Sequence, residues 1–296
     1  MIKSVYVTNY MGDSLLLPLS DYTESGIVIT EIDGIGPVEA DVHTTDYATR
    51  DGSVFNSARV QNRTVVLTLR PMEHPTVEDM RHRIYKFFPV KREVKMEVIT
   101  DRRDAYVTGY VESVEPTIFS NEEEVEVSIV CPDPYFYSAS SSEIIYSGAE
   151  PLFEFPFSNE GPSPVIIMGV ATNTNERVFD YNGDFDVGVI IHLKFTGAVS
   201  GLAVHSIEEN QNMEIDISKI PDGLQPQDEL IISTLKGSKS ARILRNGHFI
   251  NAINSIAMLS DWITVHIGSN TIIYTADSGL ENVTMSLDFN IAYEGI

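Results

Sequence analysis

The chain has 296 residues, of which 43% are hydrophobic and 21% charged, so it can bury a sizeable core and is long enough for two domains. Its 43 Asp and Glu residues against 20 Lys and Arg give a net charge of −23 at pH 7. A surface this acidic repels phosphate backbones and anionic lipid headgroups, which excludes tight or sequence-specific nucleic-acid binding as the main task.

Three further features describe where such a chain is made. No stretch reaches the roughly 18 apolar residues of a membrane span, and residues 1–20 lack the apolar core of a secretory signal. The single cysteine, Cys131, cannot close an intrachain disulfide. We therefore expect a soluble protein that has no membrane partner and is made in a reducing compartment.

The first half is predicted to be a β-sheet structure. Residues 63–70 alternate between apolar residues (Val65, Leu67, Leu69) and mostly polar ones, which predicts a strand with one face in the core. Three further strands are expected at 94–99, 106–114 and 125–129, the first two joined by a charged turn at 101–104.

Only one segment has helical periodicity. Thr76 can cap a helix, and Glu78 suits the positive end of the helix dipole. Apolar residues then recur at three- and four-residue spacing until Pro89 ends the pattern. The sequence therefore predicts one helix, over residues 77–88.

A small polar run, Ser138–Ser142, separates the two halves and is typical of a linker. We place a first domain at residues 1–137, a linker at 138–147 and a second domain at 148–296. The second domain has evenly spaced segments in which apolar and polar residues alternate, separated by Gly and Asn turns. This pattern predicts an antiparallel β-sandwich. Its expected strands are 165–171, 187–195, 213–217, 229–235, 263–267, 271–274 and 283–291.

No constellation in the sequence predicts catalysis. The Asp180–Asp186 segment resembles the start of a calcium loop, but Phe185 and Ile191 stand where that loop needs Gly and Glu, so a strand–turn–strand at Asn182–Gly183 is favoured. The seven histidines have no zinc spacing, and 237–240 lacks the glycine spacing of a phosphate loop and favours a hairpin turn. We expect no enzyme, no cofactor and no metal.

Three other residue types favour ordinary structural positions over functional ones. Cys131 lies between a strand and a proline, where a thiol is more often a small buried group than a nucleophile. The many carboxylates form no glycosidase motif and are interpreted as a solvated surface. Trp262 is the only tryptophan; a position in the core is favoured, with contact to a sugar as the alternative.

The order of several short motifs resembles distal tail proteins of long-tailed, non-contractile bacteriophages, the ring component that joins tail tube to tail tip. The most telling motif is Ser128–Phe136, with the sequence SIVCPDPYF. The others are Gly34–Pro37, Arg50–Gly52, Arg63–Leu69, Arg81–Phe88, Tyr106–Val111, Phe153–Phe157, Asn182–Gly183 and Trp262 with Gly268–Asn270.

The resemblance implies a non-enzymatic structural protein of the virion tail tip, made in the host bacterial cytoplasm. Residues 1–137 would form a hexameric ring of sheet and one helix, and residues 148–296 a galectin-like β-sandwich. The implied partners are other copies of the chain, the tail tube protein, a tail-tip or tail-associated fibre, lysin or baseplate protein, and receptor-binding proteins.

Two interpretations remain open beside a purely structural ring. The second domain is alternatively a carbohydrate-binding module that contacts host cell-wall sugars through Trp262, although Asp261–Thr264 departs from the galectin sugar-binding pattern. The acidity either makes a negative bore through which DNA slides without sticking or keeps a concentrated subunit soluble. A wall-digesting enzyme is a third class, for which the sequence provides no catalytic constellation.

Overall fold

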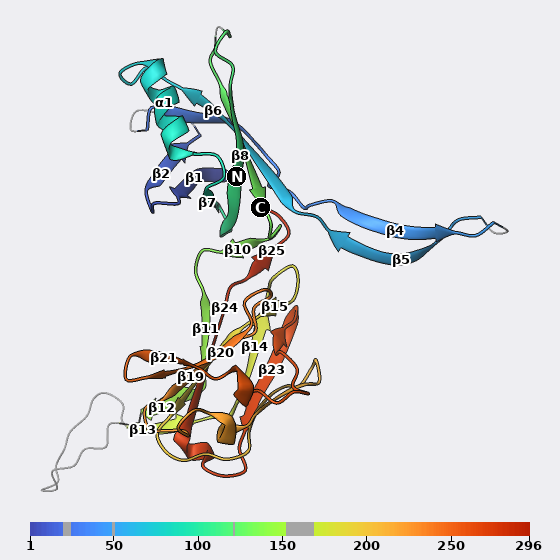
Figure 1. Ribbon diagram of the computed structural model, residues 1–296, viewed down its shortest axis with the longest axis vertical. Coiled ribbons are helices and arrows are strands. Elements are labelled where there is room, and N and C mark those ends of the chain that lie inside the picture. Colours follow the sequence, from blue (N-terminus) through green and yellow to red (C-terminus); the bar gives the residue numbers. More distant parts are fainter. Residues whose placement is uncertain (20–24, 49–50, 121, 152–168) are drawn as a thin grey trace, which may run out of the picture. The chain divides into compact units, whose positions relative to one another are not determined.

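The computed structural model describes residues 1–19, 25–48, 51–120, 122–151 and 169–296. In this part the chain forms 25 β-strands, one α-helix and three short 3₁₀-helices (Figure 1). It divides into two compact units: Met1–Ser140 together with Ala292–Ile296 (unit 1), and Ser141–Ile291 (unit 2). The expected mainly β fold with a single α-helix is therefore confirmed for the described residues.

Unit 1 is built on a nine-stranded antiparallel sheet. Its strands follow the order β2-β1-β7-β8-β9-β6-β3, and β10 pairs with both β8 and β25. The bounds are β1 Ile2–Asn9, β2 Ser14–Pro18, β3 Ile27–Asp33, β6 Arg63–Pro71, β7 Glu93–Thr100, β8 Asp104–Pro116, β9 Val125–Cys131, β10 Phe136–Ser138 and β25 Ala292–Tyr293.

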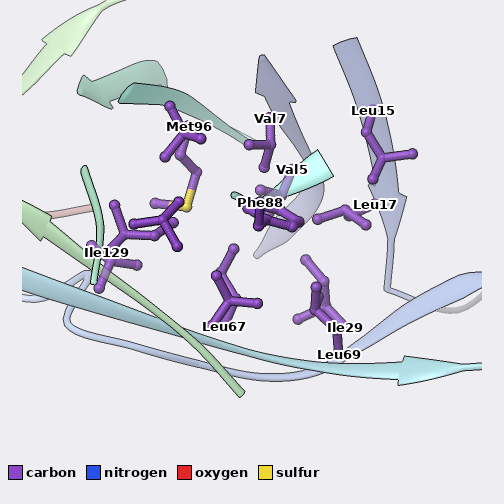
Figure 2. Packing of buried hydrophobic residues seen from close by; sticks show 14 of the residues in the cluster. Val5, Val7, Leu15, Leu17, Ile29, Leu67, Leu69, Phe88, Met96 and Ile129 are labelled. Atoms are coloured by element: carbon purple, nitrogen blue, oxygen red, sulfur yellow. The ribbon is translucent and has the colours of Figure 1, made fainter. Parts of the chain in front are cut away.

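The core of unit 1 lies on one face of this sheet. Val65, Leu67 and Leu69 of β6 are completely buried, as the alternation predicts. Figure 2 shows Leu67 and Leu69 directed toward the same interior as Phe88 and Met96. The predicted strands around 94–99, 106–114 and 125–129 correspond to β7, β8 and β9 and supply further residues of this apolar layer, together with β1, β2, β3 and α1.

The predicted helix is α1, Val77–Phe87. The Thr76 hydroxyl accepts a hydrogen bond from the Asp79 backbone N–H at 3.1 Å, which caps the first turn. Met80 and Ile84, one turn apart, are buried against the sheet. The helix ends at Phe87, and Phe88, the residue before the proline, is its C-cap, so the helix stops where Pro89 predicts.

A long hairpin, here called the arm, leaves this sheet. It consists of β4, Ala40–Asp46, and β5, Ser53–Val60, which pair with each other in a separate two-stranded sheet. The arm continues the β3–β6 pair and extends away from the rest of unit 1 (Figure 1). The sequence reasoning predicted neither of its strands.

Unit 2 contains a six-stranded sheet, in the order β11-β24-β16-β19-β20-β21, and a four-stranded sheet, in the order β14-β23-β17-β18. The two pack together through aromatic residues: Tyr181 of β14 meets Phe289 of β24 edge to face, and the Tyr146 hydroxyl donates to the Ile272 carbonyl at 3.0 Å. An antiparallel sandwich is thus observed where one was expected.

The bounds of the strands in unit 2 are as follows: β11 Ser142–Ile145, β12 Ser147–Pro151, β13 Gly169–Asn173, β14 Glu176–Tyr181, β15 Val187–Gly188, β16 Ile190–Phe195, β17 Leu202–Ser206, β18 Gln211–Ile215, β19 Glu229–Ser233, β20 Ser240–Arg245, β21 His248–Asn251, β22 Thr264–Val265, β23 Gly268–Thr275 and β24 Val283–Phe289. The 3₁₀-helices are Ile217–Lys219, Ile253–Ser255 and Leu280–Asn282.

Local details differ from the sequence predictions. The segment taken as a linker, 138–147, contains β11, which pairs with β24, and residues 292–296 return to unit 1. Asn182–Gly183 lies between two strands, β14 and β15, as expected, but these strands do not pair with each other, because β14 pairs with β23 and β15 with β22. The strand expected to reach residue 217 ends at Ile215, since Asp216 caps a 3₁₀-helix instead.

Candidate interaction surfaces

The arm presents an apolar face to solvent. Register pairs Val42 with Ala58, Ala40 with Val60 and Thr44 with Phe55, which places these side chains on one face. Val42 is 58%, Phe55 63% and Val60 40% exposed. Three large apolar side chains on one face of an exposed hairpin are a typical contact surface for another protein.

The opposite face of the arm is mostly polar, although it also carries Val54, which pairs with Thr45 and is 42% exposed. Arg59 lies 3.6 Å from the Asp41 carboxylate, and Gln61 donates to the same carboxylate at 2.7 Å. Asn56, at the bulge of β5, donates to the Thr45 hydroxyl at 2.6 Å. Because an isolated two-stranded hairpin is only marginally stable in water, this division into an apolar and a polar face favours docking through the apolar one.

Arg63 holds the base of the arm. Its side chain is only 2% exposed, and its guanidinium donates to four backbone carbonyls. These are Gly34, Gly36 at 2.6 Å, Pro134 at 2.5 Å and Glu294 at 2.6 Å. The guanidinium carbon also lies 4.6 Å from the centre of the Phe136 ring. Burial lowers the pKa of Arg63, while the four carbonyls supply the acceptors that a buried cation needs.

Gly34 begins the connection from β3 into the arm and is required for its backbone conformation. Its φ is +79°, and a Cβ at this position would lie 2.0 Å from the Thr64 carbonyl oxygen. A cavity of about 110 Å³ lies beside the same connection. Its lining residues are Gly34, Gly36, Pro37, Val38, Asn62, Arg63 and Thr64.

Cys131 follows the structural interpretation made from the sequence. It is completely buried on β9, directly opposite Arg63 of β6. Burial raises the pKa of its thiol to about 11, so the thiol is protonated at neutral pH. A buried neutral thiol packs as a small apolar group.

Trp262 lies outside the core, so the favoured position for it was wrong. It is half-buried in the loop before β22, and the Lys239 ammonium lies 5.1 Å from the centre of its ring. Lys239 comes from the 236–239 turn, which joins β19 to β20 as the predicted hairpin. A contact between Trp262 and a sugar stays a prediction.

One cluster of a histidine and two carboxylates could not be predicted from the sequence. The His192 ring on β16 lies 2.8 Å from Glu229 on β19 and 3.3 Å from Asp288 on β24. These positions are far apart in the chain, and only the strand order β24-β16-β19 brings them together. Among the described residues, no group of three or more His, Cys, Asp and Glu could hold a metal ion.

The helix that the structure describes is neither long nor apolar enough to cross a membrane. The segment 153–157 and residues Arg50 and 165–168, which the sequence reasoning used, lie outside the described residues.

Comparisons with known proteins agree with the resemblance seen in the sequence. Residues 182–291 match the model of the siphovirus-type tail component, C-terminal domain. None of the curated proteins matches this chain significantly.

Two solved structures cover almost the whole chain. The crystal structure of the phage SPP1 Dit protein, described as a paradigm of the hub adsorption apparatus in phages that infect Gram-positive bacteria, has a TM-score of 0.65 at 14% identity. The match covers 97% of this chain and 99% of that one. A chain of the phage P2 baseplate, solved in its activated conformation with calcium, has a TM-score of 0.51 at 10% identity and covers 97% and 98% of the two chains. The chain thus has the fold of the SPP1 Dit protein over nearly its whole length, and its residues 182–291 match the C-terminal domain of siphovirus-type tail components.

Proposed function

We propose that this chain is a structural subunit of the phage tail tip, in which unit 1 closes into a hexameric ring. The ring joins the tail tube protein on one rim to tail-tip, fibre or baseplate proteins on the other. The observation that carries the proposal is the arm, whose apolar face is exposed in the single chain. The family match of residues 182–291 supports the same role.

A ring requires that each copy offer two different surfaces that fit one another. Repeating such a head-to-tail contact generates a closed ring when the rotation between neighbours divides a full turn. The arm provides one surface, and β2 and β3, the outermost strands on the main path of the sheet, offer backbone groups for a second. Docking the arm on a neighbouring copy would bury the side chains of Val42, Phe55 and Val60.

The test compares charge substitutions on the two faces of the arm. Val42→Asp and Phe55→Asp place a carboxylate on the apolar face, and Ser57→Asp adds the same charge to the polar face. Light scattering and negative-stain images should show closed sixfold particles for the unchanged chain and for Ser57→Asp, and monomers for the other two. Compared at a concentration where all four proteins are monomeric, they should melt at similar temperatures, because the substituted side chains are exposed in the single chain.

Three results would count against the proposal. The first is an unchanged chain that is monomeric at every concentration, also in the presence of tail tube protein. The second is closed particles of another symmetry. The third is assembly of Val42→Asp and Phe55→Asp to the same extent as Ser57→Asp. The last result would remove the arm from the ring contact while leaving the fold untouched.

Sugar binding by unit 2 is a separate prediction. Glycan-array binding of the full chain, lost in Trp262→Ala while unit 2 remains folded, would support it. No binding by the unchanged chain would contradict it. The ammonium beside the Trp262 ring occupies space near one stacking surface, so Lys239→Ala is an informative companion variant.

A further inference from the structure

Residues 292–296, here called the strap, continue from unit 2 into unit 1. Ala292 follows Ile291, the last residue of unit 2, and pairs with Tyr137 of β10, while Tyr293 pairs with Phe136. The Arg103 guanidinium lies 4.3 Å from the centre of the Tyr293 ring and donates to the Gly295 carbonyl at 3.3 Å. The strap is thereby fixed to the body of unit 1 at its start.

The end of the strap contacts the base of the arm. The Ile296 backbone N–H donates to the Ile35 carbonyl at 3.0 Å, and the Glu294 carbonyl accepts from Arg63 at 2.6 Å. Gly295 lies so close to the same connection that a Cβ on it would be 3.0 Å from the Gly36 carbonyl carbon and the Pro37 nitrogen. Gly295 and Ile296 therefore touch the segment that leads from β3 into the arm, and Glu294 bonds to Arg63, where the chain returns from the arm into β6.

Strand pairing is interrupted at this place. The β3–β6 ladder ends at Asp33 opposite Val66, and the arm ladder starts at Ala40 opposite Val60. Residues 34–39 and 61–62 between the two ladders belong to no strand. Backbone hydrogen bonds between strands therefore do not fix the direction of the arm. The contacts of Arg63 and of the strap lie between the two ladders and can fix it.

A small change at the base has a large effect at the tip. The seven residues of β4 span about 23 Å at roughly 3.3 Å per residue. A rotation of about 10° at the base would therefore displace the far end of β4 by about 4 Å. A contact between neighbouring subunits that packs like a protein interior tolerates no such displacement.

We propose that the strap is a positioning element that sets the direction of the arm. Its consequence for assembly rests on the proposed ring function, since a misdirected arm would miss the neighbouring copy. Because only residues 290–291 separate β24 of unit 2 from the strap, one short segment connects the chain of the sandwich to the base of the arm.

The experiment measures the direction of the arm in the full chain. Spin labels on Ser53→Cys, opposite Asp46 at the far end of the arm ladder, and on His82→Cys in α1 report the distance between them by double electron–electron resonance, because both positions are exposed. The native Cys131 is completely buried and remains unlabelled. The measurement is made on monomeric protein, in a Val42→Asp background if needed, so it does not depend on ring formation.

Two variants release the strap in different ways. Gly295→Val adds a side chain where only 3.0 Å is free, and Ile296→Pro removes the N–H that bonds Ile35. Their matched controls are Ile296→Val and Ile296→Leu, which keep the N–H that bonds Ile35. The variants should shift or broaden the distance distribution by about 4 Å or more, and the controls should reproduce the parent distribution.

An unchanged distribution in a folded variant would overturn the inference. Protection of the Cys131 thiol from modification shows whether unit 1 is folded, and if Gly295→Val unfolds, Ile296→Pro decides the question. Ring assembly of the same variants is scored separately. A displaced arm with intact rings would uphold the role of the strap and contradict the role of the arm in the ring.

Discussion

Substitution of Arg63 tests how the base of the arm is stabilised. Arg63→Met keeps a long apolar stem but removes every donor to the four carbonyls. Arg63→Lys keeps the charge on a single ammonium, whose three donors cannot reproduce the planar fork of a guanidinium. Arg59→Met is the matched control, because Arg59 is 77% exposed and makes one long ion pair on the arm.

The expected loss in the free energy of unfolding depends on how many hydrogen bonds to the four carbonyls each variant removes. A carbonyl left without its donor costs about 1–3 kcal/mol when it is buried. Water entering the adjacent cavity of about 110 Å³ relieves part of that cost. We therefore expect Arg63→Met to lower the free energy of unfolding of unit 1 by about 4 kcal/mol, and Arg63→Lys by about 2 kcal/mol. The control should lose less than about 1 kcal/mol.

The chain carries one built-in probe for each unit. Cys131 in unit 1 is completely buried opposite Arg63, so its modification by a thiol reagent in urea reports the opening of unit 1. Trp262 is the only tryptophan and lies in unit 2, so its fluorescence serves as an internal reference. The thiol transition should move in both Arg63 variants while the fluorescence transition stays in place. Equal shifts in the Arg59 control would refute the reasoning.

Three further predictions concern single positions. Gly34→Ala should destabilise unit 1 by more than about 2 kcal/mol in urea, since a Cβ at φ +79° would meet the Thr64 carbonyl; wild-type stability would contradict this. Thr76→Ala should cost about 1 kcal/mol through loss of the helix cap, and a change below about 0.3 kcal/mol would argue against the cap. Burial raises the pKa of Asp228, but hydrogen bonds from Arg245 outweigh it and the net pKa is lowered. This stabilisation is present above the usual carboxyl pKa near 4 and is lost as the pH falls through the lowered value, so tryptophan fluorescence should show acid unfolding of unit 2 whose pH dependence is weaker in Asp228→Asn.

The parts of the fold that the sequence predicts well are those whose signal is local. Val65, Leu67 and Leu69 alternate in β6, and Thr76 with Pro89 brackets α1, so both elements follow from periodicity and capping alone. The hairpin around 236–239 follows from its turn residues. Each of these needs no knowledge of where the rest of the chain lies.

Elements that form through contacts between residues far apart in the chain could not be predicted from local sequence patterns. β11 lies in a serine-rich segment that resembles a linker, and it becomes a strand because β24 pairs with it. The four carbonyls that accept hydrogen bonds from Arg63 belong to residues 34, 36, 134 and 294, and no sequence motif connects these positions. A buried arginine at the start of a strand is indistinguishable in the sequence from an exposed one.

The arm could not be predicted for a different reason. Its apolar residues are arranged as in a hairpin with one buried face, but nothing in the single chain covers that face. Val42, Phe55 and Val60 occupy one face of two paired strands, as in a half-buried hairpin, yet all three are exposed. Exposed apolar residues in register across two strands expose surface to water without any gain inside the monomer. Such a pattern is stabilising only where something outside the chain covers it, and the polar bonds of Asp41 with Arg59 and Gln61 on the opposite face keep that side soluble. The division of the arm into two faces is therefore itself an argument that the functional form of this protein is an assembly.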